Sequence, residues 1–186
     1  MVNIMNEEIE LLLLVAQRLK KAKIEYMLVG SMAMTLYATP RMTRDVDIVI
    51  AVGLSDVEKL KMVFQDDFYF NENSIKSEIE REGFFNIIHK KLVVKIDFIV
   101  RKNEQYRRVE FDRRREIRIG KSYVFVATIE DVILSKLIWI KGRDSVLHRE
   151  DIENLLKSSN KIDFAYLKKW AKMLNLTGEF EGITNE

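Results

Sequence analysis

Residues 45–50 read Asp-Val-Asp-Ile-Val-Ile, and this short stretch is the most informative pattern in the 186-residue chain. Apolar β-branched residues favour a strand, and the side chains of a strand alternate between its two faces. Asp45 and Asp47 therefore point to one face, about 7 Å apart along the backbone. Two carboxylates at the start of a buried strand repel each other, and a divalent cation would relieve that repulsion.

The same two acids also have a simpler interpretation, in which they start a strand in solvent or pair with Arg41 and Arg44. A third acid favours the metal site, because Asp97 lies deep inside the apolar run 92–100, where a carboxylate needs a partner. If the two strands are neighbours, Asp97 meets the first two acids. Three such carboxylates suit two-metal phosphoryl transfer, with Asp97 either as a ligand or as the base toward an attacking hydroxyl.

A Gly-Ser pair and a lysine are also suited to binding phosphate. Gly30 and Ser31 lie between a predicted strand and a predicted helix, where free N–H groups attract phosphate and glycine permits close approach. Lys136 is surrounded on its predicted helix by apolar residues at i±3 and i±4. Its ammonium therefore either extends along the helix or enters a cleft and meets an anion, for which a nucleotide phosphate is the natural candidate.

Composition narrows the chemistry further. The chain has no cysteine and two histidines, His89 and His148, which excludes disulfides, thiol nucleophiles, iron–sulfur clusters and three-histidine metal sites. Lys plus Arg total 31 and Asp plus Glu total 29, so any basic surface must be local. The arginine-rich segment 107–115 either holds RNA phosphates or is a solvated surface segment in which acids dilute the positive charge.

Hydrophobic periodicity predicts a mixed chain. Strands are expected over residues 24–29, 45–52, 84–89, 92–100, 116–119 and 123–126. Helices are expected over residues 7–21, 31–38, 55–65, 128–140, 145–158 and 163–176, with Ser31, Thr128 and Asp163 at helix N-termini. These elements predict an α/β (α+β) core over 1–127, a helical C-terminal part over 128–177 and a flexible tail over 178–186.

The opening residues favour neither a secretory signal nor a membrane helix. Their apolar run, residues 11–16, is six residues long and follows acidic residues. We therefore expect a cytoplasmic protein that has no membrane partner.

Taken together, the motifs resemble the DNA polymerase beta-type nucleotidyltransferase superfamily. Its pattern is a Gly-Ser-like turn, an interval that here is thirteen residues, an Asp-hydrophobic-Asp stretch and a later strand aspartate. The resemblance implies a small mixed β-sheet flanked by helices, a C-terminal helical bundle, and Mg²⁺-dependent transfer of NMP from an NTP to an acceptor hydroxyl. It also implies site roles: triphosphate binding for Gly30 and Ser31, and binding of two Mg²⁺ ions, or alternatively Mn²⁺, for Asp45, Asp47 and Asp97.

Residues 39–47, 130–137 and 151–152 resemble the small bacterial and archaeal nucleotidyltransferase-like proteins related to AbiE-type toxins. The resemblance implies functional roles for Lys136 and Asp151, although a solvated helix face explains Asp151 equally well. Arg44 either neutralises triphosphate charge or pairs with Asp45.

The expected partners are an NTP, an acceptor that is tRNA, another RNA, a protein or a small molecule, and an antitoxin. A housekeeping transferase, a catalytically silent nucleotide-binding module acting in a complex, and purely structural ion pairs are the alternatives.

Overall fold

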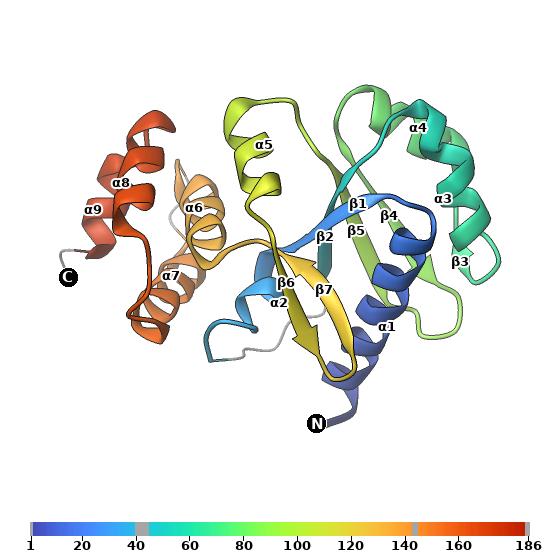
Figure 1. Cartoon of the computed structure of the whole chain (residues 1–186), viewed down its shortest axis with the longest axis horizontal. Helices are drawn as coiled ribbons and strands as arrows, with labels where there is room; N and C mark the ends of the chain where they lie inside the picture. Colours follow the sequence, from blue (N-terminus) through green and yellow to red (C-terminus); the bar gives the residue numbers. More distant parts are fainter. Residues whose placement is uncertain (1, 40–44, 143–144, 185–186) are drawn as a thin grey trace.

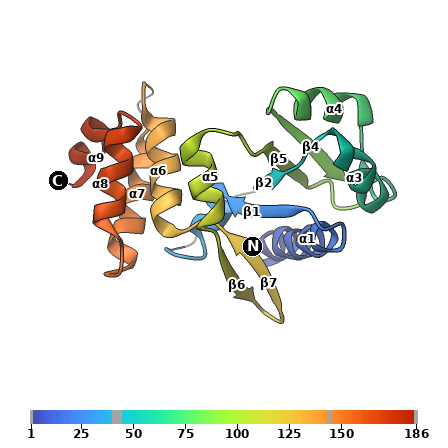
Figure 2. The ribbon, with the colours of Figure 1, turned by 45° about the horizontal axis from the view of Figure 1, so that its top comes forward.

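A mixed β-sheet forms the centre of the molecule (Figures 1 and 2). The computed structural model describes residues 2–39, 45–142 and 145–184, so Arg41 and Arg44 lie outside the described residues. Within that part the sheet has seven strands in the order β3-β4-β5-β2-β1-β7-β6. The strands are β1 (Glu25–Val29), β2 (Val46–Ala51), β3 (Phe68–Tyr69), β4 (Phe84–His89), β5 (Lys95–Val100), β6 (Arg115–Ile119) and β7 (Ser122–Val126).

The two strands that carry the predicted acids are neighbours. β2 runs antiparallel to β1 and parallel to β5, and Asp47 is the register partner of Asp97. Along β2 and β5, buried residues alternate with partly exposed ones, and both aspartates belong to the partly exposed set. One face of these strands therefore packs into the core, while the other presents both carboxylates at the same level of the sheet.

Helices pack around the sheet, and several of them form one end of the molecule (Figures 1 and 2). They are α1 (Val2–Lys21), α2 (Gly30–Met34), α3 (Val57–Phe64), α4 (Glu72–Glu80), α5 (Gln105–Asp112), α6 (Ile129–Ile140), α7 (Val146–Ser158), α8 (Phe164–Met173) and α9 (Thr177–Thr184), with a 3-10 turn at Leu54–Asp56. Helices α6 to α9 gather at one end of the molecule, and α3 and α4 lie at the other (Figures 1 and 2). Among the described helices, none is both long enough and apolar enough to cross a membrane.

Side-chain caps fix where three of the C-terminal helices begin. The side chains of Thr128, Ser145 and Asp163 accept hydrogen bonds from backbone N–H groups in the first turns of α6, α7 and α8. The predicted starts at Thr128 and Asp163 are confirmed. At α2 the prediction was wrong, because Val29 is the N-cap residue and Ser31 lies inside the first turn.

Two other predictions differ from the structure. Strand β5 begins at Lys95 rather than at residue 92, because Val93 has a φ of +55° that interrupts an extended backbone. The expected flexible tail is wrong over residues 178–184, which belong to α9. Its residues Phe180 and Ile183 are three positions apart, so they share one helix face, and both are buried.

Candidate functional site

Three acids and one lysine meet where β2 and β5 begin. Asp47 and Asp97 are opposite each other in the sheet, and Asp45 directly precedes β2 with a mostly exposed side chain. Lys95, on the same face of β5, places its Nζ 2.7 Å from Oδ2 of Asp97 and 3.7 Å from Oδ1 of Asp45. The predicted meeting of the three carboxylates is therefore confirmed in part, with an ammonium group between two of them.

The carboxyl group of Asp47 has a perturbed pKa. Burial raises its pKa to about 6, and the negative charges of Asp97 and Asp45 contribute to the same increase. Lys95 and Lys136 act in the opposite direction without cancelling the effect. A metal-free Asp47 is thus held in a position that disfavours its charged form.

Gly30 forms the wall against which Asp47 lies. Its φ is +68°, in the left-handed region that favours glycine, and a Cβ built on it would overlap Oδ2 of Asp47. The turn between β1 and α2 therefore requires glycine for two reasons, its backbone conformation and the close approach of the carboxylate.

Lys136 forms a buried ion pair. Its Nζ lies 2.6 Å from Oδ2 of Asp151, and the two side chains are 5% and 2% exposed. One of the two expected alternatives was that this ammonium group meets an anion, and it does. The anion, however, is the Asp151 carboxylate on α7 of the same chain. Asp151 is consequently buried rather than part of a solvated helix face, and it is suited to positioning Lys136.

A pocket of about 680 Å³ joins these features. Gly30, Ser31, Asp47 and Lys136 line it, together with residues of α5, α6 and α7. Among the predicted site residues that the structure describes, Asp45, Asp97 and Asp151 do not lie on its wall. The pocket has further positive charge from Arg107, which belongs to the arginine-rich segment, and from Arg101, Lys102 and Lys141, which the sequence did not single out.

The donor set is chemically suited to magnesium. Mg²⁺ prefers carboxylate oxygens, water and phosphate, and a divalent cation would lower the raised pKa of Asp47. In the part of the chain that the structure describes, no three Asp, Glu or His side chains converge into a finished metal site. Lys95 instead supplies the positive charge beside Asp45 and Asp97, and metal binding by Asp45, Asp47 and Asp97 stays a prediction.

The arginine-rich segment is largely committed to pairs within the chain. Arg107 Nη1 lies 2.8 Å from Oε2 of Glu110, and Arg114 Nη2 lies 2.6 Å from Oε1 of Glu25. Arg113 binds Asp131 through its Nε at 3.2 Å. Arg107 pairs inside the segment, whereas Arg113 and Arg114 pair with residues far away in the sequence, which local charge counting cannot identify. RNA binding by this segment stays a prediction.

Glu110, Ser135 and Trp139 are among the residues of the pocket wall for which the sequence predicted no role. The Ser135 hydroxyl donates to Oε1 of Glu110 at 2.9 Å, while Arg107 holds the other carboxylate oxygen. Burial raises the pKa of Glu110, although Arg107 opposes this effect. The only available sequence signal was spacing, since Arg107 and Glu110 are three apart on one helix, as are Lys136 and Trp139.

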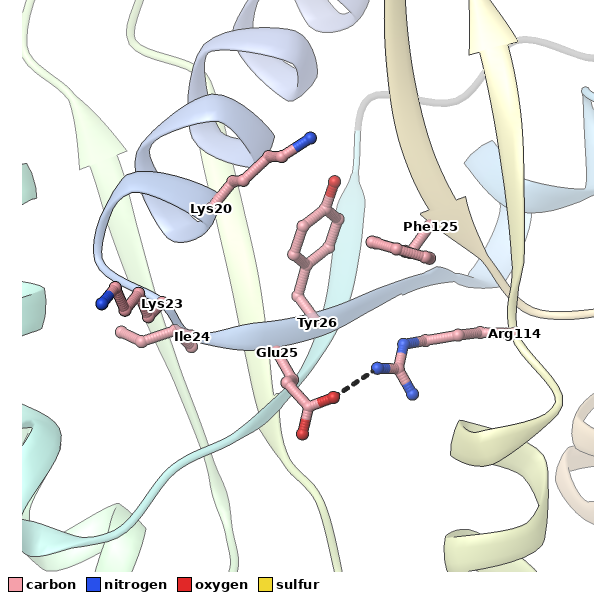
Figure 3. A pocket seen from close by; sticks show the side chains of 7 residues that line it. All are labelled: Lys20, Lys23, Ile24, Glu25, Tyr26, Arg114 and Phe125. Carbon is pink, nitrogen blue, oxygen red and sulfur yellow. Dashed lines mark hydrogen bonds and ion pairs between the residues drawn. The ribbon is translucent and has the colours of Figure 1, made fainter.

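A second pocket, of about 310 Å³, lies beside the end of α1 and contains none of the predicted site residues among its lining (Figure 3). Lys20, Lys23, Tyr26 and Arg114 contribute to its wall, and Arg114 is already paired there with Glu25. It therefore provides no alternative to the larger pocket as the candidate site.

Comparisons with known proteins identify the fold. No family model matches the chain, and no curated protein matches it significantly. Among solved structures, an antigenic nucleotidyltransferase-like protein from Paracoccidioides brasiliensis superposes with a TM-score of 0.57 at 20% identity, covering 82% of this chain and 75% of that one. The lincomycin-bound lincosamide antibiotic adenylyltransferase gives 0.52 at 13% identity, covering 78% and 94%.

A third similar structure is the antibiotic-resistance factor ANT(2'')-Ia, with a TM-score of 0.52 at 11% identity, covering 94% of this chain and 93% of that one. These identities are low, so the likeness concerns architecture. The predicted fold is confirmed, while the relation to AbiE-type toxins stays a prediction. The chain has the nucleotidyltransferase fold.

Proposed function

We propose that this protein is a Mg²⁺-dependent nucleotidyltransferase that moves NMP from an NTP to an acceptor hydroxyl. One observation carries the proposal: Asp47 is half-buried beside Asp97 and against Gly30, at the wall of a pocket that Lys136 also lines. A carboxylate whose pKa is raised by like charges is stabilised by an incoming cation. The same pocket has the basic side chains that a triphosphate needs.

The reaction has a simple balance. The acceptor oxygen forms a bond to the α-phosphorus, the bond from that phosphorus to the bridging oxygen breaks, and pyrophosphate leaves. Asp97 would either accept the hydroxyl proton or serve as a metal ligand with Asp45 and Asp47. Bound Mg²⁺ would supply neutralising charge for the phosphates.

Lys136 would bind the triphosphate, and Asp151 would hold its ammonium in position through the 2.6 Å ion pair. Gly30 would let the triphosphate approach the backbone closely, and Ser31 would contribute a hydroxyl in the same pocket. Ser31 and Asp151 therefore have different proposed roles. Ser31 would contact the triphosphate, whereas Asp151 would only position Lys136.

The acceptor follows from the sequence resemblance rather than from the pocket. Similarity of residues 39–47 and 130–137 to AbiE-related proteins supports a toxin-like enzyme acting on tRNA or another RNA in the cytoplasm, with an antitoxin as partner. A protein or a small molecule is the alternative acceptor, as in the lincomycin-bound adenylyltransferase with the same fold.

The test is transfer from each labelled NTP in the presence of Mg²⁺, with total RNA, protein and small alcohols as acceptors. We expect a labelled product and released pyrophosphate, and a loss of about 1,000-fold in Asp47→Asn because several kcal/mol of charge stabilisation disappear. Asp112→Asn is the control, since Asp112 is an exposed carboxylate at the end of α5.

Two results would contradict the proposal. Near-normal transfer by Asp47→Asn would remove Asp47 from the chemistry. NTP binding without pyrophosphate release, across all acceptors, would indicate the catalytically silent module instead.

A further inference from the structure

Trp139 occupies an unusual position in the candidate pocket. Its side chain is 60% exposed although it lies on the pocket wall, on α6 one helical turn beyond Lys136. The chain has two tryptophans, and the other, Trp170, is 4% exposed and packs against Tyr106 with ring centroids 5.0 Å apart. Trp139 is therefore a large aromatic surface that the folded chain leaves open to the pocket.

Contacts connect this indole to the buried ion pair. The Trp139 and His148 rings have centroids 6.5 Å apart and planes inclined by 46°. His148 Nδ1 lies 4.0 Å from Oδ2 of Asp151, the same oxygen that binds Lys136. On a helix that rises about 1.5 Å per residue, the α-carbons of Lys136 and Trp139 are about 4.5 Å apart along the axis.

The pocket combines this flat apolar surface with positive charge. Lys136, Lys141, Arg101 and Lys102 line the same pocket as Trp139, and its volume of about 680 Å³ is typical of small-ligand sites, which span roughly 300–1,000 Å³. The basic residues favour a polyanion, whereas the indole favours a planar ring. A nucleoside triphosphate has both features, with one ribose between its α-phosphate and its base.

We propose that Trp139 is the stacking surface for the nucleobase of the bound nucleoside triphosphate, with the phosphates toward Lys136 and Asp47. This inference rests on the proposed function, because it assigns the base end of the same donor substrate. Stacking on an aromatic face tolerates every base, so the contact adds affinity without selecting one NTP. Two residues of α7 contact this part of the pocket: Asp151 pairs with Lys136, and His148 packs near the Trp139 ring.

The first measurement uses the two tryptophans as they are. Because Trp170 is buried and Trp139 is open to the pocket, NTP titration with Mg²⁺ should quench the exposed indole emission, while inorganic tripolyphosphate should not. Calorimetry on the full chain gives the Kd of both ligands independently of fluorescence. We expect the NTP to bind more tightly than tripolyphosphate in the wild type.

The second measurement uses variants. Trp139→Ala should weaken NTP binding about 5- to 100-fold, the range that base–aromatic stacking corresponds to, and leave tripolyphosphate binding unchanged. Trp139→Phe should retain most of the affinity. Val146→Ala is the matched control, because Val146 is 67% exposed on α7 and is not among the residues that line the pocket in the described part of the chain.

The outcomes separate the two proposals. Equal NTP affinity in wild type and Trp139→Ala, or an equal loss for NTP and tripolyphosphate, would overturn the stacking role while the proposed function survives. Wild-type binding of tripolyphosphate as tight as that of every NTP would do the same. If neither ligand binds the wild type, the proposed function fails together with this inference.

Discussion

Two aspartates whose pKa is raised by burial, Asp131 and Asp47, have opposite surroundings. Asp131, on α6, is fully buried, and hydrogen-bond donors approach it from four side chains. Thr128 Oγ1 and Tyr166 Oη donate to it at 2.7 Å, Arg113 Nε at 3.2 Å and Tyr106 Oη at 3.3 Å. Burial raises its pKa, and Thr128, Tyr166 and Arg113 oppose that increase.

Asp47 has the reverse arrangement. Burial raises its pKa too, but here the neighbouring carboxylates Asp97 and Asp45 add to the increase. A charge that stabilises a fold is neutralised by donors from the same chain, as at Asp131. At Asp47 the like charges of Asp97 and Asp45 add to the cost of burial, and this difference is what separates a structural acid from a candidate site acid.

The largest expected effect is on Asp131. Asp131→Ala should lower the free energy of unfolding by about 3–5 kcal/mol, because it leaves the buried hydroxyls of Thr128 and Tyr106 without their acceptor. The half-buried guanidinium of Arg113 loses its acceptor as well. Urea denaturation measures it. Asp112→Ala, which removes an exposed carboxylate, should change stability by no more than about 0.5 kcal/mol. A similar small loss in both variants would show that the donors around Asp131 find other partners.

A smaller loss is expected where Asp47 meets the β1–α2 turn. Gly30→Ala should lower the free energy of unfolding by about 2–3 kcal/mol, since it combines a left-handed backbone with overlap on the Asp47 carboxylate. Gly120→Ala is the matched control, because Gly120 has a φ of +59° and open space around a built Cβ. Thermal or urea unfolding gives the free energy of unfolding of both variants, and the difference between their losses is the contribution of the overlap with Asp47. Equal losses would mean that Asp47 moves away freely.

The smallest expected effect is an increase in the free energy of unfolding rather than a loss. In the metal-free protein, Asp47→Asn should raise the free energy of unfolding by about 1–2 kcal/mol above pH 6, since the amide removes a disfavoured buried charge. The folded pKa of about 6 exceeds the usual 3.8, so the wild type loses stability as the pH rises between these values. Below pH 4 the difference between the two proteins should vanish.

Urea denaturation across pH 3.5–8 in the presence of a chelator tests this prediction. Added Mg²⁺ should then stabilise the wild type more than the variant. A variant that is less stable than the wild type at neutral pH would show that Asp47 is a structural acid like Asp131.

Much of the β-sheet and part of the site could be predicted from local patterns. The alternation within residues 45–50 and 92–100 identified which strand faces carry Asp47 and Asp97, and their adjacency is confirmed. Glycine followed by a helix marked Gly30, although its contact with Asp47 depends on the antiparallel pairing of β1 and β2. Patterns of this kind work because strand periodicity is a property of neighbouring residues.

The pairings that cross the chain could not be predicted in the same way. Lys136 and Asp151 lie on different helices, and only the packing of α6 against α7 brings them within 2.6 Å. Arg113 finds Asp131 eighteen positions later, on a helix whose first turn is buried. Single-sequence reading identifies candidate charges, but it does not indicate which opposite charge each one meets.

The contacts around Asp131 also bear on how the chain can be divided. Arg113 and Tyr106 come from the part before residue 128, whereas Asp131 and Tyr166 come from the helices after it. A fragment ending at residue 127 would lose Lys136 and Trp139 from the pocket and leave an aromatic ring and a guanidinium without their neighbours. Expression of residues 1–127 alone is therefore a poor way to obtain a smaller folded protein that keeps the pocket.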